Sequence, residues 1–433
     1  MAIKKAISAA IISGFGLIVA NHADASGFAL IEESASGMGN AFAGGAAGAE
    51  DTSTLFFNPA GMTRLSGQQM SLVLHAIKPT VEFSNTGSTA APGRSLGNSG
   101  GDAGHWAGVP NLYYVAELSP KLRAGLGISS PFGLKTDYDS NWMGRFQAIK
   151  SDLKTININP SLAYKINEQW SVGAGLDAQY IEAMLTNAVN LGAAEGFAQV
   201  KGNDWSVGYN LGVLYEMNPA TRFGLAYRSD VRHKLEGDVT FSGGVPLANG
   251  PISAEMTLPE TVSLSGFHQI NEQWAVMADA TWTRWSRFKE LRIVRDSGAL
   301  VSLTPENWKD TMRYAVGANY QATNKLKLRS GVAYDQSPVS DQYRTARIPD
   351  ANRVWLTFGA SYKLSQADSL DAGYAHIFVD NSSINSTTTS SGKLVGCRRR
   401  GASGGSAGAC RPRGSPGSWR ATRPGTACSE SCG

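Results

Sequence analysis

The chain has no cysteine over almost its whole length. All four cysteines lie in the last part of the 433-residue sequence, at Cys397, Cys410, Cys428 and Cys432. The body of the protein therefore has no disulfide framework, and the even cysteine count says nothing about its fold. Long apolar runs are also scarce, because after the first 25 residues none approaches the roughly 20 residues of a spanning helix. A helical membrane protein is thereby excluded.

Signals of catalysis, metal binding and nucleic-acid binding are weak. The six histidines have no metal-ligand spacing, and no Gly-x-Ser-x-Gly elbow is present. Gly37 to Phe42 begins like a dinucleotide loop but lacks the third glycine. The formal charge of +4 belongs to the tail, where seven arginines and one glutamate follow Gly396. We expect neither an enzyme nor a bound cofactor, metal or nucleic acid.

The first 25 residues read as a secretory signal peptide. Lys4 and Lys5 form a basic start, an apolar stretch follows from Ala6 to Ala20, and Ala23-Asp24-Ala25 offers a small-residue cleavage site. Cleavage is expected before Ser26.

Six short polar turns recur along the chain, each flanked by alternating apolar and polar residues. They are Glu117 to Lys121, Lys165 to Gln169, Glu216 to Thr221, Gln269 to Gln273, Gln321 to Lys325 and Lys363 to Ala367. Period-two alternation between tight turns predicts a β-meander. The run from Trp205 to Tyr215 shows the pattern, with large apolar residues at every second position.

Alternation alone also fits a soluble sandwich, so strand length and the N-terminus decide the environment. Several runs reach ten residues or more, against about 5 to 6 in soluble strands and roughly 9 to 11 in strands that cross a bilayer. Aromatic residues such as Tyr164, Trp170 and Trp274 gather beside the short turns, which suits an interfacial girdle. An exported protein of this kind must span as a closed barrel. We predict an all-β transmembrane antiparallel β-barrel in the outer membrane of a Gram-negative cell.

Thirteen strands can be placed, near residues 68–83, 109–118, 121–130, 154–165, 169–185, 204–217, 220–240, 253–270, 273–293, 308–322, 325–335, 352–364 and 368–380. Bacterial barrels have even strand numbers, so a fourteenth strand from about Ser391 is expected within a barrel domain of residues 68–396. The tail of residues 397–433 is rich in Arg, Gly, Ser and Cys and lacks the alternation that such a strand needs. A translational frameshift or cloning error is favoured over a disordered basic tail, because the junction falls inside a strand.

Residues 26–67 precede the first strand and no barrel strand needs them. Small residues alternate there with a few large apolar ones, a composition suited to short helices packed inside the barrel. We predict an N-terminal helical hatch in the lumen.

The sequence of the predicted hatch resembles that of a known protein family. The Gly27-Phe28 start, the run from Ser34 to Gly44 and the end Phe57-Asn58-Pro59-Ala60-Gly61-Met62 resemble the outer-membrane long-chain fatty acid transporters, whose relatives include toluene and xylene uptake channels. The resemblance continues through Pro131 to Leu134, Trp142 to Phe146 and Ile158 to Tyr164, and covers residues 26–396. It implies a fourteen-stranded barrel, a hatch with the Asn58-Pro59-Ala60 motif, and passive uptake of hydrophobic molecules. The tail departs from the pattern.

Two hatch sites are predicted for ligand binding or gating. The resemblance suggests that the segment around Gly27 and Phe28 contacts the ligand, although Phe28 could equally belong to the plug core. Asn58-Pro59-Ala60 could simply start a turn, but its context after Phe56 and Phe57 favours a function.

Two further candidates lie in the barrel. Ser130-Pro131-Phe132-Gly133 interrupts the third strand and favours a bulge or kink. It is either an ordinary strand end or a lateral opening through which ligand leaves. Arg145 is a candidate for a fatty acid carboxylate, since arginine stays charged and binds a carboxylate through two hydrogen bonds. Its alternative is a solvated loop or lumen charge.

The predicted function is passive uptake of hydrophobic small molecules, with long-chain fatty acids preferred and monoaromatic hydrocarbons such as toluene or xylene as the alternative. Such solutes gain about 0.8 kcal/mol per buried CH₂ and cross a lipopolysaccharide-covered leaflet slowly. Outer-membrane lipid, lipopolysaccharide and the barrel-assembly machinery are the other expected partners. A general diffusion porin and an outer-membrane lipid hydrolase are the rival functions.

Overall fold

The computed structural model describes residues 27–388 and 392–398. The predicted signal peptide and nearly all of the predicted tail lie outside the described residues. The chain divides into two compact units, Met1–Gly401 and Ala402–Gly433, and every described residue belongs to the first. Within those ranges no helix has the length and apolar character needed to cross a membrane.

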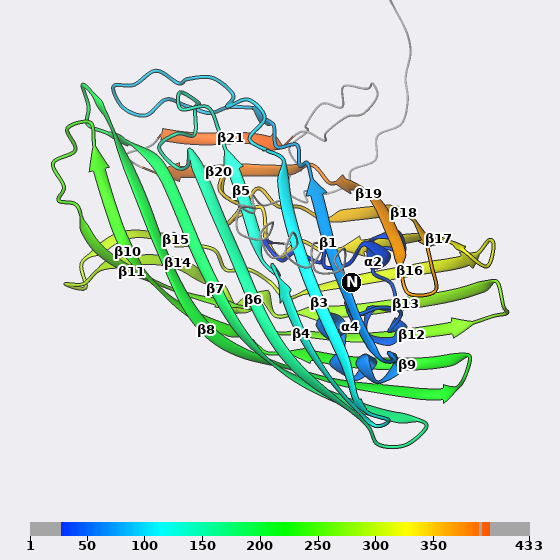
Figure 1. The fold of residues 1–433 in the computed structure, drawn as a ribbon. Coiled ribbons are helices and arrows are strands. Elements are labelled where there is room, and N and C mark those ends of the chain that lie inside the picture. The colour runs from blue at the N-terminus through cyan, green and yellow to red at the C-terminus, as the bar shows by residue number, and fades with distance from the viewer. Residues whose placement is uncertain (1–26, 389–391, 399–433) are drawn as a thin grey trace, which may run out of the picture. The chain divides into compact units, whose positions relative to one another are not determined.

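The first unit is built around one antiparallel sheet of eighteen strands (Figure 1). In chain order the strands are β1 (Gln68–Ile77), β3 (Ala107–Ser119), β4 (Leu122–Ser129), β5 (Gly133–Asp137), β6 (Lys150–Lys165), β7 (Trp170–Asn190), β8 (Glu195–Asn218), β9 (Thr221–Arg228), β10 (Val231–Ser242), β11 (Gly250–Leu258), β12 (Thr261–Gln269), β13 (Trp274–Thr283), β14 (Glu290–Arg295), β15 (Leu300–Pro305), β16 (Thr311–Gln321), β17 (Leu326–Asp335), β18 (Arg353–Lys363) and β19 (Ser369–Val379).

The meander predicted from the turns is confirmed. Strand β6 ends at Lys165 and β7 begins at Trp170, and the other five predicted turns lie between paired strands in the same way. Three of the predicted strands are interrupted, because residues 220–240 contain the break between β9 and β10, residues 253–270 that between β11 and β12, and residues 273–293 that between β13 and β14. Two others are extended past their predicted bounds, since β5 follows β4 and β15 precedes β16. The eighteen strands therefore make thirteen spans across the sheet.

The two ends of the sheet are β1 and β19. In the described part of the chain, β1 pairs with β3 and β19 pairs with β18, each on one side only. The prediction that the segment from about Ser391 supplies the fourteenth barrel strand is wrong for the described residues, where this segment forms β21 (Gly392–Arg398). It pairs with β20 (Ser382–Thr388) and β2 (Phe83–Asn85) in a separate three-stranded sheet. The predicted fourteenth span is thus not among the described residues.

Apolar side chains of the sheet point outward, and polar side chains point inward. In β8, Trp205, Val207 and Leu211 are exposed, whereas Asn210 between them is buried. The same holds in neighbouring strands, where Leu176 is exposed and Asp177 is buried. Water would disfavour such an outer face, whereas lipid stabilises it. The barrel predicted from alternation is therefore confirmed in both pairing and orientation.

The residues before β1 fold into four short helices on the inner side of the sheet: α2 (Ala35–Gly39), α3 (Gly45–Gly48), α4 (Thr54–Phe57) and the 3₁₀ helix η1 (Pro59–Arg64). Helix α2 contacts β1, β17, β18 and β19, α3 contacts β8, β9, β12 and β13, and η1 contacts β4, β6, β7 and β8. Because strands from around the sheet touch these helices, the sheet encloses them (Figure 1). We call residues 27–67 the hatch.

Candidate functional site

The Asn58-Pro59-Ala60 motif anchors the hatch to the barrel wall. The Asn58 side chain is buried, accepts a hydrogen bond from the Ala60 N–H at 3.0 Å, and donates to the carbonyls of Ala46 at 2.7 Å and Val213 at 3.0 Å. A Cβ at Gly212 would lie 1.9 Å from Asn58 Oδ1. Glycine in β8 therefore permits this close approach, and the motif's geometry is that of an anchor.

Inward-facing arginines hold further hatch carbonyls. Arg123 donates to Leu65 O, Arg222 to Ala47 O and Gly48 O, Arg228 to Phe56 O and Arg313 to Ala41 O, at 2.7, 2.6, 2.5, 3.0 and 2.7 Å. Hydrogen bonds from charged donors each contribute about 1.5–3 kcal/mol. The hatch from Ala41 to Leu65 is thus fixed to the wall.

Phe28 and Leu30, near the start of the hatch, are held differently, by contacts between neutral backbone groups. The Gly133 N–H donates to Phe28 O and the Leu30 N–H donates to Pro131 O, both at 2.8 Å. Ala29 and Phe132 form an antiparallel bridge between these bonds. The predicted gating residues and the predicted kink therefore meet as two short paired segments.

The kink is a β-bulge in the third span. Ser129 in β4 is paired with Asn157 and Gly133 in β5 is paired with Lys154, so the three residues Ser130 to Phe132 face only two residues of β6. One of these two, Thr155, bonds the bulge through its hydroxyl, which accepts from Phe132 N–H at 3.0 Å and donates to Phe132 O at 2.8 Å.

The bulge leaves a gap in the wall between β3 and β5. Strand β3 pairs with β4 only from Leu112 onward, and its residues Ala107 to Asn111 are paired, among the described strands, with β1 alone. The hatch fills this gap: Leu30 packs on Ala107 and Val109, and the Asn111 amide donates to Glu32 O at 2.9 Å. We call Gly27 to Glu32 the gate segment.

Phe28 is enclosed by aromatic rings. It is 1% exposed, and its ring lies 4.8 Å from Trp285, 5.5 Å from Trp308, 5.9 Å from Phe288 and 6.0 Å from Phe132, measured between centroids. Trp285, Phe288 and Trp308 come from the interruptions beside β13, β14 and β16. The breaks in these spans therefore build the cage around Phe28.

Two cavities lie on either side of the gate segment. The loop-side cavity is lined by Phe28, Leu134, Leu153, Leu235, Met256 and Phe288, and Ser151, Asp152, Glu306 and Arg347 are among its polar members. Its enclosed volume is about 60 Å³, so in this closed state it is a narrow apolar pocket. Arg347 donates to Lys150 O and Ser151 Oγ at 3.2 Å, and its burial lowers the pKa of the guanidinium to about 10.

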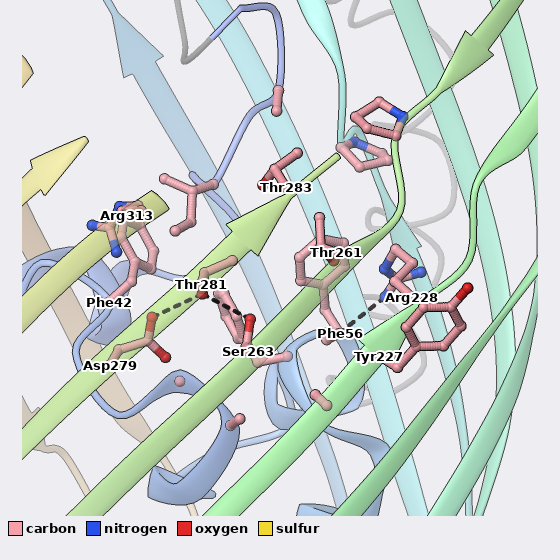
Figure 2. A pocket seen from close by; sticks show the side chains of 18 of the residues that line it. Phe42, Phe56, Tyr227, Arg228, Thr261, Ser263, Asp279, Thr281, Thr283 and Arg313 are labelled. Atoms are coloured by element: carbon pink, nitrogen blue, oxygen red, sulfur yellow. Dashed lines mark hydrogen bonds between the residues drawn. The ribbon is translucent and has the colours of Figure 1, made fainter. Parts of the chain in front are cut away.

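The hatch-side cavity is lined by the next residues of the gate segment, Ala29, Leu30 and Ile31, and by Pro131 and Phe132 of the bulge. Its wall is largely apolar, with Arg228, Asp279, Arg313 and Asp335 as charged members; the first three are labelled in Figure 2. Since Phe28 faces one cavity and Ala29 to Ile31 face the other, the gate segment is the partition between them.

Arg145 lies elsewhere and has other partners. It is 1% exposed and forms a two-pronged pair with Glu195, with distances of 3.0 and 2.7 Å, and it also donates to Ser95 O, Leu96 O and Trp142 O. It lines neither cavity. The geometry favours a structural role for Arg145, and carboxylate binding by this residue stays a prediction without support here.

Within the hatch, Glu33 is fully buried and accepts a hydrogen bond from the Tyr113 hydroxyl at 2.8 Å. Burial raises the pKa of the Glu33 carboxyl to about 8, although the Tyr113 hydrogen bond opposes the shift. In the described ranges, no three His, Cys, Asp or Glu side chains come together as a possible metal site.

The fold and the site define a class of protein, a membrane barrel with an internal hatch, two apolar cavities and a bulged third span. Residues 16–408 match the family described as outer membrane protein transport protein (OMPP1/FadL/TodX), and the chain belongs to this family. It is therefore an outer-membrane protein of a transport family.

Individual relatives agree with this assignment. The chain is 33% identical over 399 residues to a long-chain fatty acid transport protein of Escherichia coli O6:H1, covering 83% of this chain and 88% of the relative. It is 34% identical over 412 residues to outer membrane protein P1 of Haemophilus influenzae, with coverage of 83% and 88%. A crystal structure of a Pseudomonas aeruginosa FadL homologue superposes with a TM-score of 0.82 at 26% identity, covering 86% of this chain and 97% of that one.

Toluene transporters share the fold. That of Ralstonia pickettii superposes with a TM-score of 0.60 at 23% identity, covering 83% of this chain and 96% of that chain.

Proposed function

We propose that this protein carries hydrophobic molecules, long-chain fatty acids above all, passively across the outer membrane, and that the gate segment controls their passage. The observation that carries the proposal is the gate segment itself. It closes a gap in the barrel wall by pairing with the bulge, and it separates two apolar cavities. The names of the fatty acid transport relatives support the choice of ligand.

The proposed path has four steps. Ligand enters the loop-side cavity, displaces the gate segment, passes into the hatch-side cavity, and leaves sideways through the gap between β3 and β5. A ligand can shift the gate only by binding its open and closed states with different affinity. Phe28 supplies that coupling, because it belongs to the gate segment and lines the loop-side cavity.

The gate segment is the part of the hatch that moves in this proposal. Its bonds to the bulge are between neutral backbone groups, each contributing about 0.5–1.5 kcal/mol. The Gly27 N–H bond to Asp350 and the packing of Phe28 add to this hold. An alkyl chain gains about 0.8 kcal/mol per buried CH₂, so a long chain is needed to offset all of these contacts. Asn58 and the inward-facing arginines keep the rest of the hatch in place, which would prevent the steady ion flow of a general porin.

Transport without catalysis is the simplest function that these residues support. Monoaromatic hydrocarbons remain the second candidate ligands, because toluene transporters share this fold. Growth on oleate or on toluene of a deletion strain that carries this gene separates the two ligand classes.

A reversible cross-link tests the gate. Ala29 and Phe132 are bridge partners, so Ala29→Cys with Phe132→Cys, in a chain whose four tail cysteines are replaced by serine, should form a disulfide that locks the gate. The proposal expects fatty acid uptake to stop in the oxidised protein and to return on reduction, while binding to the loop-side cavity persists.

A matched cross-link serves as the control. The hydroxyls of Thr63 in the hatch and Ser171 in β7 are 2.9 Å apart, and neither residue belongs to the gate segment. Thr63→Cys with Ser171→Cys should lock the hatch body and leave uptake unchanged. Uptake that continues with the gate cross-linked, or stops with the hatch body cross-linked, would refute the proposal.

A further inference from the structure

The hatch-side cavity contains one cation with unused hydrogen-bond donors. Arg313 in β16 is 6% exposed. Its Nη2 donates to Ala41 O at 2.7 Å, whereas its Nε and Nη1 are buried and have no hydrogen-bond partner among the described residues. Leaving buried charged donors unpaired costs more free energy than leaving neutral ones unpaired. The site therefore favours a guest that brings an acceptor.

The other charged groups of the cavity already have partners. Arg228 pairs with Asp177 and donates to Phe56 O. The Asp279 carboxylate accepts from the Ser265 hydroxyl at 2.5 Å and the Thr281 hydroxyl at 2.9 Å. Figure 2 shows Asp279 and Thr281 joined in this way, with Arg313 beside Phe42.

Acidic residues around Arg313 reduce the net positive charge of the cavity and so weaken its overall attraction for anions. Asp279 and Asp335 line the same cavity, so the lining as a whole is not strongly positive. Discrimination must then come from the free donors of Arg313 rather than from the overall potential. A pure hydrocarbon would cover these donors without pairing them, whereas an anionic headgroup would satisfy them at short range.

We propose that the hatch-side cavity is a second binding station for amphiphilic anions, in which Arg313 receives the carboxylate and the apolar wall receives the chain. The inference rests on the proposed function and adds to it a selective step. Phe42 and Trp355 supply the apolar wall near Arg313, which lies 5.6 Å from the Trp355 ring, whereas Phe56 lines the cavity beside Arg228. Ligand that passes the gate segment is therefore sorted by headgroup before it reaches the bulge.

The test compares two probes that differ only in the headgroup: hexadecanoic acid brominated at its chain end, and the alcohol of the same brominated chain. Quenching of tryptophan fluorescence in the purified full chain measures binding. The unchanged protein should bind the acid about tenfold more tightly than the alcohol, equivalent to about 1.4 kcal/mol. Arg313→Gln should bring the ratio close to one by weakening the acid alone.

Two further variants keep the test decisive. Arg222→Gln also removes bonds to hatch carbonyls, but Arg222 does not line the cavity, so the acid-to-alcohol ratio should stay unchanged. Arg347→Gln removes the cation of the loop-side cavity. If the ratio falls in Arg347→Gln and persists in Arg313→Gln, or falls equally in Arg222→Gln, the proposal is overturned.

The result also separates this inference from the proposed function. If the unchanged protein takes up both probes equally well and Arg313→Gln does the same, transport stands and selection by Arg313 fails. If neither probe binds or enters cells, the proposed function itself fails.

Discussion

The backbone N–H of Gly27 donates a hydrogen bond to Oδ2 of Asp350 at 3.0 Å. This bond joins the start of the gate segment to the long connection between β17 and β18, 323 residues further along the chain. Asp350 also accepts from the Ser337 hydroxyl at 2.7 Å and pairs with Arg353. The connection between β17 and β18 therefore fixes one end of the gate segment while the bulge fixes its middle.

Gly27→Ala should loosen the gate. Gly27 has a φ of +62°, and a Cβ there would lie 2.7 Å from Trp308 and 2.9 Å from Trp285. We expect the gate segment to leave its cage, and single-channel recordings to show more frequent opening than in the unchanged protein.

Gly67→Ala is the matched control for that experiment. Gly67 has a φ of +63°, but a Cβ there would meet nothing within 4 Å. It carries the same backbone strain without the crowding, so recordings should match the unchanged protein. Equal opening in both variants would mean that crowding at Gly27 does not hold the gate.

Phe28→Ala should uncouple ligand binding from opening. The ring is enclosed by four aromatic neighbours, and removing such a side chain costs about 3–5 kcal/mol. We expect a rise in basal conductance that added fatty acid no longer increases. A variant that still responds to fatty acid as the unchanged protein does would contradict the coupling assigned to Phe28.

The stability of the hatch should fall as the pH rises. The pKa of Glu33 is raised from 4.5 to about 8 in the folded protein, so its neutral form is favoured on folding. Its contribution is fully present below about pH 4.5 and is lost as the pH rises through about 8. Glu33→Gln should flatten the dependence of the urea unfolding midpoint on pH across that window.

Burial also raises the pKa of Glu32, so some dependence on pH should remain in Glu33→Gln. Glu236→Gln, at an exposed position in β10, is the control and should leave the profile unchanged. A profile that is identical in Glu33→Gln and the unchanged protein would show that Glu33 does not titrate in this range.

Arg145→Gln should lower stability without changing ligand preference. Arg145 is buried and donates to three backbone carbonyls as well as to Glu195, whose side chain is 32% exposed, and a hydrogen bond from a charged donor contributes about 1.5–3 kcal/mol. The midpoint of urea unfolding measures the loss. A selective loss of fatty acid binding at unchanged stability would restore Arg145 as a carboxylate-binding residue.

The strands could be predicted from the sequence because their signal is local. Alternation and turn residues decide each hairpin independently, so the positions of spans such as β7 and β18 follow from short windows. The interruption of the third span at Ser130 to Gly133 could be predicted from its proline and glycine. The breaks at Glu260 and at Arg284 to Lys289 could not, because the alternating pattern continues on both sides of them. The loss of alternation between Arg284 and Lys289 is the sequence signal that marks Trp285 and Phe288.

The contacts of the site could not be predicted, because they join residues far apart in the chain. The sequence around Arg145 does not indicate that its partner is Glu195, 50 residues away. Arg313 lies in an alternating pattern like that of many other inward-facing polar residues, so the sequence does not single it out. The meeting of the gate segment with the bulge depends on how the hatch folds back into the barrel. The resemblance indicated both segments separately, and the geometry shows that they pair.

The fourteenth span expected from the sequence should be encoded in another reading frame of the gene. Strands β1 and β19 each have one partner in the described residues, and the tail after Gly396 has no alternation. Reading the other two frames after this point should reveal an alternating segment that ends in an aromatic residue. Finding no such segment in either frame would reject the frameshift.

Removal of the bulge tests the lateral exit most directly. Deleting Ser130 and replacing Pro131 by valine would leave two residues, both with a backbone N–H, opposite Thr155 and Ile156. This lets β4 run into β5 as a regular strand and closes the gap beside β3. The account predicts that fatty acid uptake is lost while the purified protein still binds fatty acid in its loop-side cavity. Uptake at the rate of the unchanged protein, with the barrel folded and the bulge gone, would contradict it.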